Sequence, residues 1–148
     1  MNRSQSIRKD ELGFTLIELL VVIAVIALIG GIVASNVVGN FNRAKVETTK
    51  IQMKQIGVIL NSFKLDCGFF PTTEQGLDAL IHKPSGRECK KYDPEGYIGD
   101  KKIPKDGFDN DFIYISEGNK YTLKSLGNDG KEGGDGIDKD ISTDDPEF

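Results

Sequence analysis

The sequence is poor in the side chains that most often perform catalysis or hold transition metals. It contains one histidine, His82, and two cysteines, Cys67 and Cys89, which are too far apart for a Cys-x-x-Cys motif. Zinc sites and nucleophile–base pairs depend on such residues. No glycine-rich loop of the phosphate-binding type is visible either. We therefore expect a structural protein and not an enzyme, with His82 as a surface or structural residue.

Proline breaks helices, and the sequence has none before Pro71, so no proline interrupts a helix in the first half of the chain. The run from Phe14 to Ala34 is apolar except for Thr15 and Glu18. Its length corresponds to about 30 Å of helix, the thickness of the hydrocarbon core of a bilayer. The pattern predicts a leader over residues 1–13, a transmembrane helix over 14–36 and an exported head over 37–148. The basic residues of the leader place the N-terminus in the cytoplasm.

Beyond Gly39, apolar or small residues recur every three or four positions, which predicts that the same helix continues to about Asp66. We expect this stripe to pack on the globular part of the head. Its members are Phe41, Ala44, Thr48, Ile51, Gln55 or Ile56, Ile59 or Leu60, and Phe63. Gly68 is suited to cap the end of the helix, and Pro71 prevents its continuation.

The rest of the head reads as short elements separated by turns. Thr72 or Thr73 can cap a short helix that begins at Glu74. Residues 112–116 and 120–126 are rich in aromatic and β-branched side chains and flank a Gly-Asn turn, which predicts a β-hairpin. Packed on the helix, the hairpin makes an α+β head.

The cysteine pair lies wholly in the predicted exported part. Two cysteines in a small exported domain predict one disulfide, Cys67–Cys89. The alternative is a pair of unrelated buried thiols.

Charge is distributed unevenly along the chain. The net charge of −4 argues against nucleic acid as a partner. From Asp106 to the end there are 12 acidic residues against 4 lysines, and the segment 127–141 alone holds five glycines and four aspartates. Clustered carboxylates and free carbonyl groups in a flexible loop suit Ca²⁺ better than Mg²⁺ or Zn²⁺. On the residues alone, a calcium site and a solvated acidic loop both remain open.

The segment Gly13-Phe14-Thr15-Leu16-Ile17-Glu18, behind a short leader with basic residues, resembles the processing signal of type IV pilins and pseudopilins. The resemblance implies that a prepilin peptidase cuts after Gly13 and methylates the new N-terminal Phe14. It also implies that Glu18 guides assembly into a helical filament. The plain alternative is a single-pass anchor or uncleaved signal with a stray glutamate.

Two further runs resemble one branch of that family, the major pseudopilins of type II secretion. The first is Phe70-Pro71-Thr72-Thr73-Glu74-Gln75-Gly76-Leu77, and the second is Ser125-Leu126-Gly127-Asn128-Asp129-Gly130. In that branch the second run precedes a structural calcium loop. The implied ligands are the side chains of Asp129, Asp135, Asp138 and Asp140 and the carbonyl groups of Leu126 and Ile141.

The resemblance implies a pilin-like ladle, with a long transmembrane and amphipathic helix packed on a small head that carries the hairpin and the metal-binding loop. It implies a single-pass protein of the bacterial inner membrane with its head in the periplasm. Copies would polymerise into a pseudopilus that drives export of folded proteins across the outer membrane. The partners would be minor pseudopilins, the inner-membrane assembly platform and the prepilin peptidase. The alternatives are a type IV pilin of a surface fibre and a membrane-tethered, calcium-dependent receptor.

Overall fold

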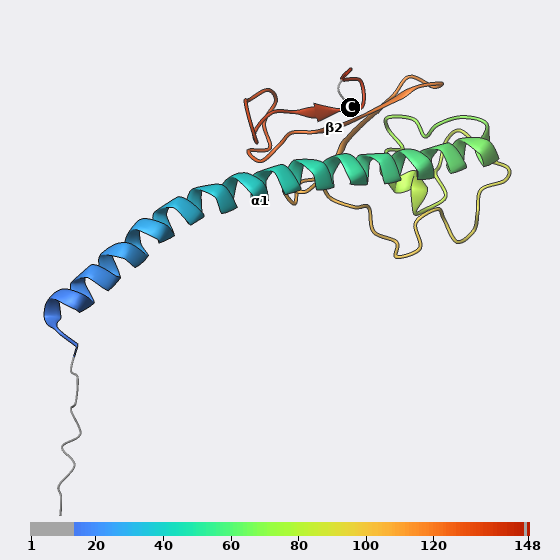
Figure 1. The fold of residues 1–148 in the computed structure, drawn as a ribbon. Coiled ribbons are helices and arrows are strands. Elements are labelled where there is room, and N and C mark those ends of the chain that lie inside the picture. The colour runs from blue at the N-terminus through green and yellow to red at the C-terminus, as the bar shows by residue number, and fades with distance from the viewer. Residues whose placement is uncertain (1–13, 147) are drawn as a thin grey trace, which may run out of the picture. The chain divides into compact units, whose positions relative to one another are not determined.

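The computed structural model describes residues 14–146 and 148, and only the backbone of residues 32–37. The predicted leader, including Gly13, lies outside the described residues. The chain divides into two compact units, one ending at Gly39 and one running from Asn40 to Phe148. We call the second unit, residues 40–148, the head (Figure 1).

A single helix, α1, runs from Leu16 to Cys67 and is 52 residues long. It ends where the sequence indicates, because Gly68 adopts a left-handed φ of 81° and its N–H donates to the carbonyl group of Lys64 at 2.7 Å. This is a common C-terminal cap, and glycine suits it because it has no Cβ. Within the described part of the chain, we find no helix with both the length and the apolar character needed to cross a membrane.

The core of the head is built on one face of α1. Met53, Ile56, Leu60 and Phe63 are all buried, at the spacing of three or four residues that brings side chains to the same side of a helix. The prediction for the first half of the stripe was wrong, because Phe41 is 60% exposed and Ile51 is 48% exposed.

Ala44 and Thr48, also predicted to face inward, are exposed as well. In their place Val46 and Thr49 face the head. Two rows of apolar residues share this part of α1, and packing against the rest of the head selects only one of them.

The segment after α1 covers one end of the core and is fastened by the predicted disulfide. Cys67 and Cys89 are bonded, with their Cα atoms 4.7 Å apart, which confirms the pairing. Phe63 packs edge-on against Phe69 and Tyr92 beside this bond. The disulfide therefore closes the loop over an aromatic cluster.

The short helix predicted to begin at Glu74 starts later and is a 3-10 helix, η1 (Leu77–Leu80). Thr72 and Gln75 form a reciprocal pair ahead of it. The backbone N–H of Gln75 donates to Thr72 Oγ1 at 3.2 Å, and that of Thr72 donates to Gln75 Oε1 at 2.9 Å. This pair closes a turn over 73–76, and the positive φ of Gly76, +60°, separates that turn from η1.

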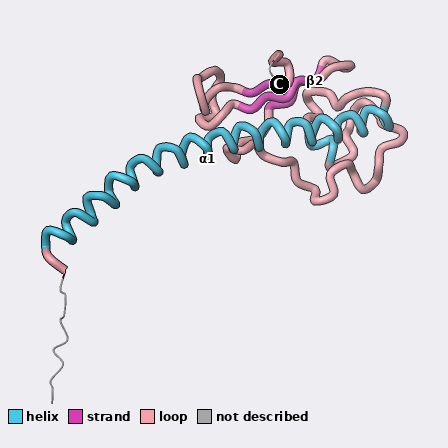
Figure 2. Tube along the Cα trace, viewed as in Figure 1, coloured by secondary structure: helices cyan, strands magenta, loops and turns pink. Residues whose placement is uncertain are grey.

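Three antiparallel strands form the sheet in the order β1 (Ile113–Ser116), β2 (Tyr121–Ser125), β3 (Ile141–Ser142). The hairpin of β1 and β2 confirms the prediction, with Tyr114 opposite Leu123. The third strand, β3, was not predicted from the sequence, and it pairs Ile141 with Ser125. Figure 1 shows the strands on one side of the head part of α1 and the loops drawn in yellow on the other, and Figure 2 shows how much of the head is loop.

Candidate functional site

Of the residues predicted for processing and assembly, the structure describes Phe14 and Glu18, at the start of α1. The backbone N–H of Glu18 donates to Thr15 Oγ1 at 3.2 Å, so Thr15 is the N-cap and Leu16 the first helical residue. Phe14 precedes the helix and is 82% exposed. Glu18 lies in the first turn, where the helix dipole favours a negative charge. Gly13, the predicted cleavage residue, lies outside the described residues.

The N-terminal part of α1, from Leu16 to Ile29, has apolar side chains on all sides of the helix. Large exposed hydrophobic residues occupy most positions between Leu16 and Ile29. Monomeric proteins in water rarely expose a continuous apolar surface of this size. This segment therefore requires either lipid or other protein chains around it.

The acidic loop, residues 127–141, begins at a position that is fixed from two sides. The N–H of Gly127 donates to Ser125 Oγ at 3.3 Å, and its carbonyl oxygen accepts from Asn110 Nδ2 at 2.8 Å. Gly127 has a φ of +63°, and a Cβ there would lie 2.7 Å from the carbonyl carbon of Asp138. Only glycine allows the two ends of the loop to approach this closely.

Each predicted aspartate ligand has a distinct environment. Asp129 Oδ1 accepts from the N–H of Lys131 at 3.1 Å, and Asp138 Oδ1 accepts from Asn128 Nδ2 at 3.1 Å. The carbonyl oxygen of Asp135 accepts from the N–H of Asp138 at 3.2 Å. Three of the four aspartates thus organise the loop through local hydrogen bonds.

Asp140 is the most constrained of the four aspartates. Its Oδ2 lies 2.9 Å from Lys124 Nζ and accepts from the N–H of Gly133 at 3.0 Å. Burial pushes the pKa of Asp140 upward, but the hydrogen bonds from Lys124 and Gly133 outweigh burial and hold the pKa below its ordinary value. Its other oxygen, Oδ1, is buried and has no hydrogen-bond partner.

The oxygen donors of this loop fit a hard cation in their chemistry. The segment 127–141 offers carboxylates and carbonyl groups and contains neither histidine nor cysteine. The two predicted carbonyl ligands lie near each other along the sheet, because Ile141 pairs with Ser125 and Leu126 follows Ser125. The unpaired Oδ1 of Asp140 is an acceptor that a cation would satisfy. Among the described residues, however, no three His, Cys, Asp or Glu side chains converge as a ready metal cluster.

Sequence reasoning missed the residue that anchors this region, Asp106. Its carboxylate is buried, accepting from the N–H groups of Phe108 and Asn110 through Oδ1 and from the hydroxyl of Ser125 through Oδ2 at 2.5 Å. The next residue, Gly107, donates its N–H to Thr49 Oγ1 on α1 at 2.9 Å. The signal available in the sequence was an Asp-Gly pair in a turn-rich segment, which does not reveal partners so distant along the chain.

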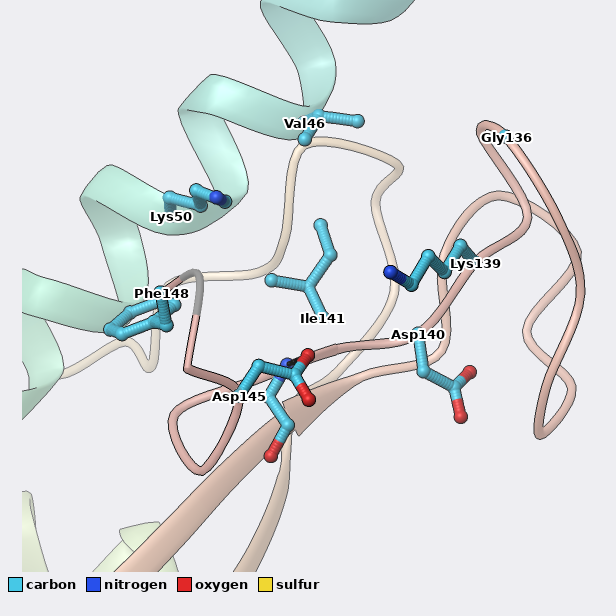
Figure 3. A pocket seen from close by; sticks show the side chains of 9 residues that line it. Val46, Lys50, Gly136, Lys139, Asp140, Ile141, Asp145 and Phe148 are labelled. Carbon is cyan, nitrogen blue, oxygen red and sulfur yellow. Dashed lines mark hydrogen bonds between the residues drawn. The ribbon is translucent and has the colours of Figure 1, made fainter.

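A hollow of about 160 Å³ lies where the end of the acidic loop and the C-terminus meet α1 (Figure 3). Val46, Ile141 and Phe148 supply its apolar lining, with Lys50 and Asp145 also on its walls. Phe148 packs against the core, and Lys54 Nζ lies 5.5 Å from its ring centroid. The C-terminal residue is therefore part of the structure of the head.

The fold and the N-terminal segment together define a class of protein, the pseudopilins. A crystal structure of the major pseudopilin from the type 2 secretion system of enterohaemorrhagic Escherichia coli superposes with a TM-score of 0.61 at 29% identity. The match covers 73% of this chain and 93% of that one. Residues 8–34 match the prokaryotic N-terminal methylation motif.

More specific matches cover the head. Residues 36–144 match the family described as type II secretion system protein G. The type II secretion system core protein G of Pseudomonas aeruginosa is 40% identical over 137 residues, covering 90% of this chain and 95% of the relative. The core protein G of Vibrio cholerae is 38% identical over 135 residues, covering 90% and 91%. This chain belongs to the type II secretion system protein G family.

Family membership decides between the functions that the sequence left open. The chain is a structural pseudopilus subunit of protein secretion and not an enzyme, as predicted. The surface-fibre pilin and the non-polymerising receptor are the less supported alternatives, because the family match extends through the head and is not confined to the N-terminal signal.

Proposed function

We propose that copies of this chain polymerise through the N-terminal part of α1 into a periplasmic pseudopilus whose growth drives export of folded proteins across the outer membrane. Before assembly, a prepilin peptidase removes residues 1–13 by cutting after Gly13 and methylates Phe14. The segment 14–36 anchors the subunit in the inner membrane with its head in the periplasm. Minor pseudopilins and the inner-membrane assembly platform are the partners that build the filament.

One observation carries this proposal: Glu18 places a carboxylate in the first turn of α1, in a segment, Leu16 to Ile29, whose other side chains are mostly large, apolar and exposed. A charge in such surroundings requires a partner once lipid or protein covers the helix, since an unpaired buried charge costs several kcal/mol. Cleavage after Gly13 creates a suitable partner, the α-ammonium group of Phe14. In the filament, Glu18 pairs with that ammonium group on an adjacent copy.

Glu18→Ala tests the proposal. We expect the variant protein to enter the membrane and fold its head normally, but to form few or no filaments, because the ammonium group of Phe14 is left without a carboxylate. Filaments are measured by shearing and electron microscopy, with loss of residues 1–13 verified by mass spectrometry of the wild-type protein. Thr15→Ser retains the helix cap and serves as the matched control. Normal filaments from Glu18→Ala would refute the pairing.

We also propose that the acidic loop binds Ca²⁺ through the side chains of Asp129, Asp135, Asp138 and Asp140 and the carbonyl groups of Leu126 and Ile141. The bound ion would neutralise carboxylates that otherwise repel one another in a loop rich in glycine. The oxygen-only donor set and the unpaired Asp140 Oδ1 support this assignment. Lys124 already contributes one positive charge next to Asp140 and holds that carboxylate at the sheet.

Calcium removal tests the assignment on the purified head. A ligand that binds only the folded form stabilises it by about 2.7 kcal/mol at a hundredfold excess over Kd. Chelation should therefore lower the melting temperature, and Asp129→Ala should reproduce that loss and abolish the heat of calcium binding in a calorimetric titration. Asp111→Ala is the matched control, since Asp111 is exposed and lies outside the loop. No heat of binding at saturating calcium, together with an unchanged melting temperature, would show that the loop is a solvated acidic segment and not a calcium site.

A further inference from the structure

Three aspartate–glycine pairs occur in the chain, and the structure gives each of them a different environment. They are Asp106-Gly107, Asp129-Gly130 and Asp135-Gly136. In such a pair the backbone nitrogen of the glycine can attack the carboxyl carbon of the aspartate, because glycine has no side chain to obstruct the approach. The reaction requires a carboxylate that can rotate and a glycine N–H that is not bonded elsewhere. Hydrogen bonding and burial therefore rank the three pairs.

The first pair is protected on both sides of the reacting bond. The carboxylate of Asp106 is buried and accepts hydrogen bonds from two backbone N–H groups and from the hydroxyl of Ser125. The N–H of Gly107 donates to Thr49 Oγ1 on α1 at 2.9 Å. These bonds must all break before the nitrogen can reach the carboxyl carbon, so reaction at Asp106 requires the head to open locally.

The third pair has none of this protection. Asp135 and Gly136 are both exposed, and Figure 3 shows Gly136 at a bend of the acidic loop. Within the part of the chain that the structure describes, the Asp135 carboxylate has no hydrogen bond or ion pair, and the N–H of Gly136 has no acceptor. A Cβ built on Gly136 would meet nothing within 4 Å. Both reacting groups are therefore free to move.

The second pair is intermediate. Asp129 and Gly130 are exposed, but Asp129 Oδ1 accepts from the N–H of Lys131 at 3.1 Å. Rotation of this carboxylate toward the nitrogen of Gly130 breaks that hydrogen bond. One hydrogen bond of ordinary strength slows a reaction about fivefold.

We propose that Asp135 is a site of spontaneous isomerisation to isoaspartate. The backbone nitrogen of Gly136 attacks Cγ of Asp135, a new C–N bond forms, and one carboxyl oxygen leaves as water with the amide proton and a proton from solvent. The product is a cyclic imide in which this nitrogen is bonded to both carbonyl carbons of Asp135. Water then adds to the former main-chain carbonyl carbon and breaks its bond to nitrogen, which regains a proton. Only water and a proton are exchanged, so the step needs no enzyme, oxidant or metal.

Isomerisation would change how the acidic loop is held. Isoaspartate directs the backbone through the side chain, which adds one CH₂ group, and it converts the former main-chain carbonyl group into a carboxylate. The carbonyl oxygen of Asp135 accepts from the N–H of Asp138 at 3.2 Å, and Asp138 Oδ1 accepts from Asn128 Nδ2 at 3.1 Å. The modification therefore acts on the turn that positions Asp138. The proposal itself does not depend on polymerisation or on calcium.

The positions of the lysines allow the three pairs to be measured separately in one sample. Cleavage after lysine places them in three peptides, 106–120, 125–131 and 132–139. The detergent-extracted full-length protein is incubated at neutral pH in H₂¹⁸O with a chelator, and then digested in ordinary water. Each passage through the imide leaves one ¹⁸O in the peptide, and fragmentation by electron transfer distinguishes isoaspartate from aspartate. The chelator removes cations from the loop, so the result is independent of the calcium assignment.

We expect the ¹⁸O label to accumulate fastest in peptide 132–139. It should be about fivefold slower in 125–131, because of the one hydrogen bond to Asp129. It should be at least about a hundredfold slower in 106–120, because of the opening that Asp106 requires. The same protein unfolded in urea provides the reference, and there the three rates should converge because all three pairs have the same two residues.

Asp135→Glu is the matched variant. Glutamate keeps the charge at an exposed position, but its longer side chain must close a larger and less favourable ring. We expect this variant to lose the label and the isoaspartate in 132–139 while 125–131 is labelled as in the wild-type protein. Equal labelling of 106–120 and 132–139 in the folded protein would overturn the proposal, and so would a label in 132–139 that persists in Asp135→Glu.

Discussion

Individual small residues decide how closely the loops of the head approach α1. Gly107 is the clearest example, since its N–H bonds to Thr49 and a Cβ at this position would overlap the carbonyl group of Lys45. The carboxylate of Asp106, the residue before it, accepts hydrogen bonds from two backbone N–H groups and from the hydroxyl of Ser125. These two residues therefore connect the helix to the start of the acidic loop.

Gly107→Ala should destabilise the head by about 1–3 kcal/mol, the usual range for overpacking a close contact. The obstacle is backbone, which cannot move aside as a flexible side chain would. Chemical denaturation of the purified head measures the difference in the free energy of unfolding. Gly99→Ala provides the control, because a Cβ there has no neighbour within 4 Å. Equal stability of the two variants would show that the close approach is not maintained in solution.

At the level of elements, the segment that follows α1 and includes η1 depends on a covalent bond. The Cys67–Cys89 disulfide closes a loop with a sequence separation of 22 residues, and Phe63, Tyr92 and Tyr97 pack together beside it. The enclosed residues, 68–88, contain no strand or α-helix, only the 3-10 helix η1. Such a segment loses much conformational entropy on folding, which the cross-link partly removes from the unfolded chain.

Removing this bond in Cys67→Ser/Cys89→Ser should lower the free energy of unfolding by about 3 kcal/mol, as the chain-entropy relation gives for a loop of this length. Urea denaturation of the head measures the change. A reductant should destabilise the wild-type head to a similar degree and leave the double variant unaffected. If the double variant unfolds at the same urea concentration as the oxidised wild-type protein, packing alone maintains the loop.

At the level of the whole molecule, all four tyrosines lie in the head and share one titration behaviour. Burial raises the pKa of Tyr114 to about 12, and burial followed by the hydrogen bond to Asp66 raises that of Tyr97 to about 12. Burial also raises the pKa of Tyr92 and of Tyr121. In each case the folded head holds the phenolic proton more tightly than the unfolded chain does.

The sign of the pH dependence follows from these shifts. Because the pKa of these tyrosines is raised in the folded state, the free energy of unfolding does not change through them below pH 10.0, the pKa of the unfolded chain. It falls as the pH rises from 10.0 toward about 12, the pKa in the folded head. We expect the head to lose stability across that interval, with phenolate absorbance appearing as it unfolds. In Tyr114→Phe, the loss of the hydrogen bond to Pro71 should cost about 1 kcal/mol at neutral pH. The loss of stability at alkaline pH should be smaller in Tyr114→Phe than in the wild-type head. A phenolate signal that rises with the head still folded would contradict the burial of these side chains.

Local chemistry along the chain is sufficient to predict several elements of the fold. The absence of proline before Pro71, together with Gly68, defines the end of the long helix to within one residue. Aromatic and β-branched residues around a Gly-Asn turn identify β1 and β2. The pairing of Cys67 with Cys89 is correct because the chain has only these two cysteines. The composition of residues 127–141 marks the acidic loop, and the N-terminal motif indicates the family.

The tertiary structure decides which of several locally acceptable arrangements the head adopts. Periodicity alone assigns Phe41 and Ile51 to the core, but both apolar rows on α1 satisfy the helical spacing and only contact with distant segments chooses between them. β3 is too short to be recognised without its partner strand. Asp106 bonds to Ser125 and Asp140 pairs with Lys124, and in both cases the partner belongs to a different element far along the chain. Burial and charge pairing depend on distances in space, which a linear pattern does not contain.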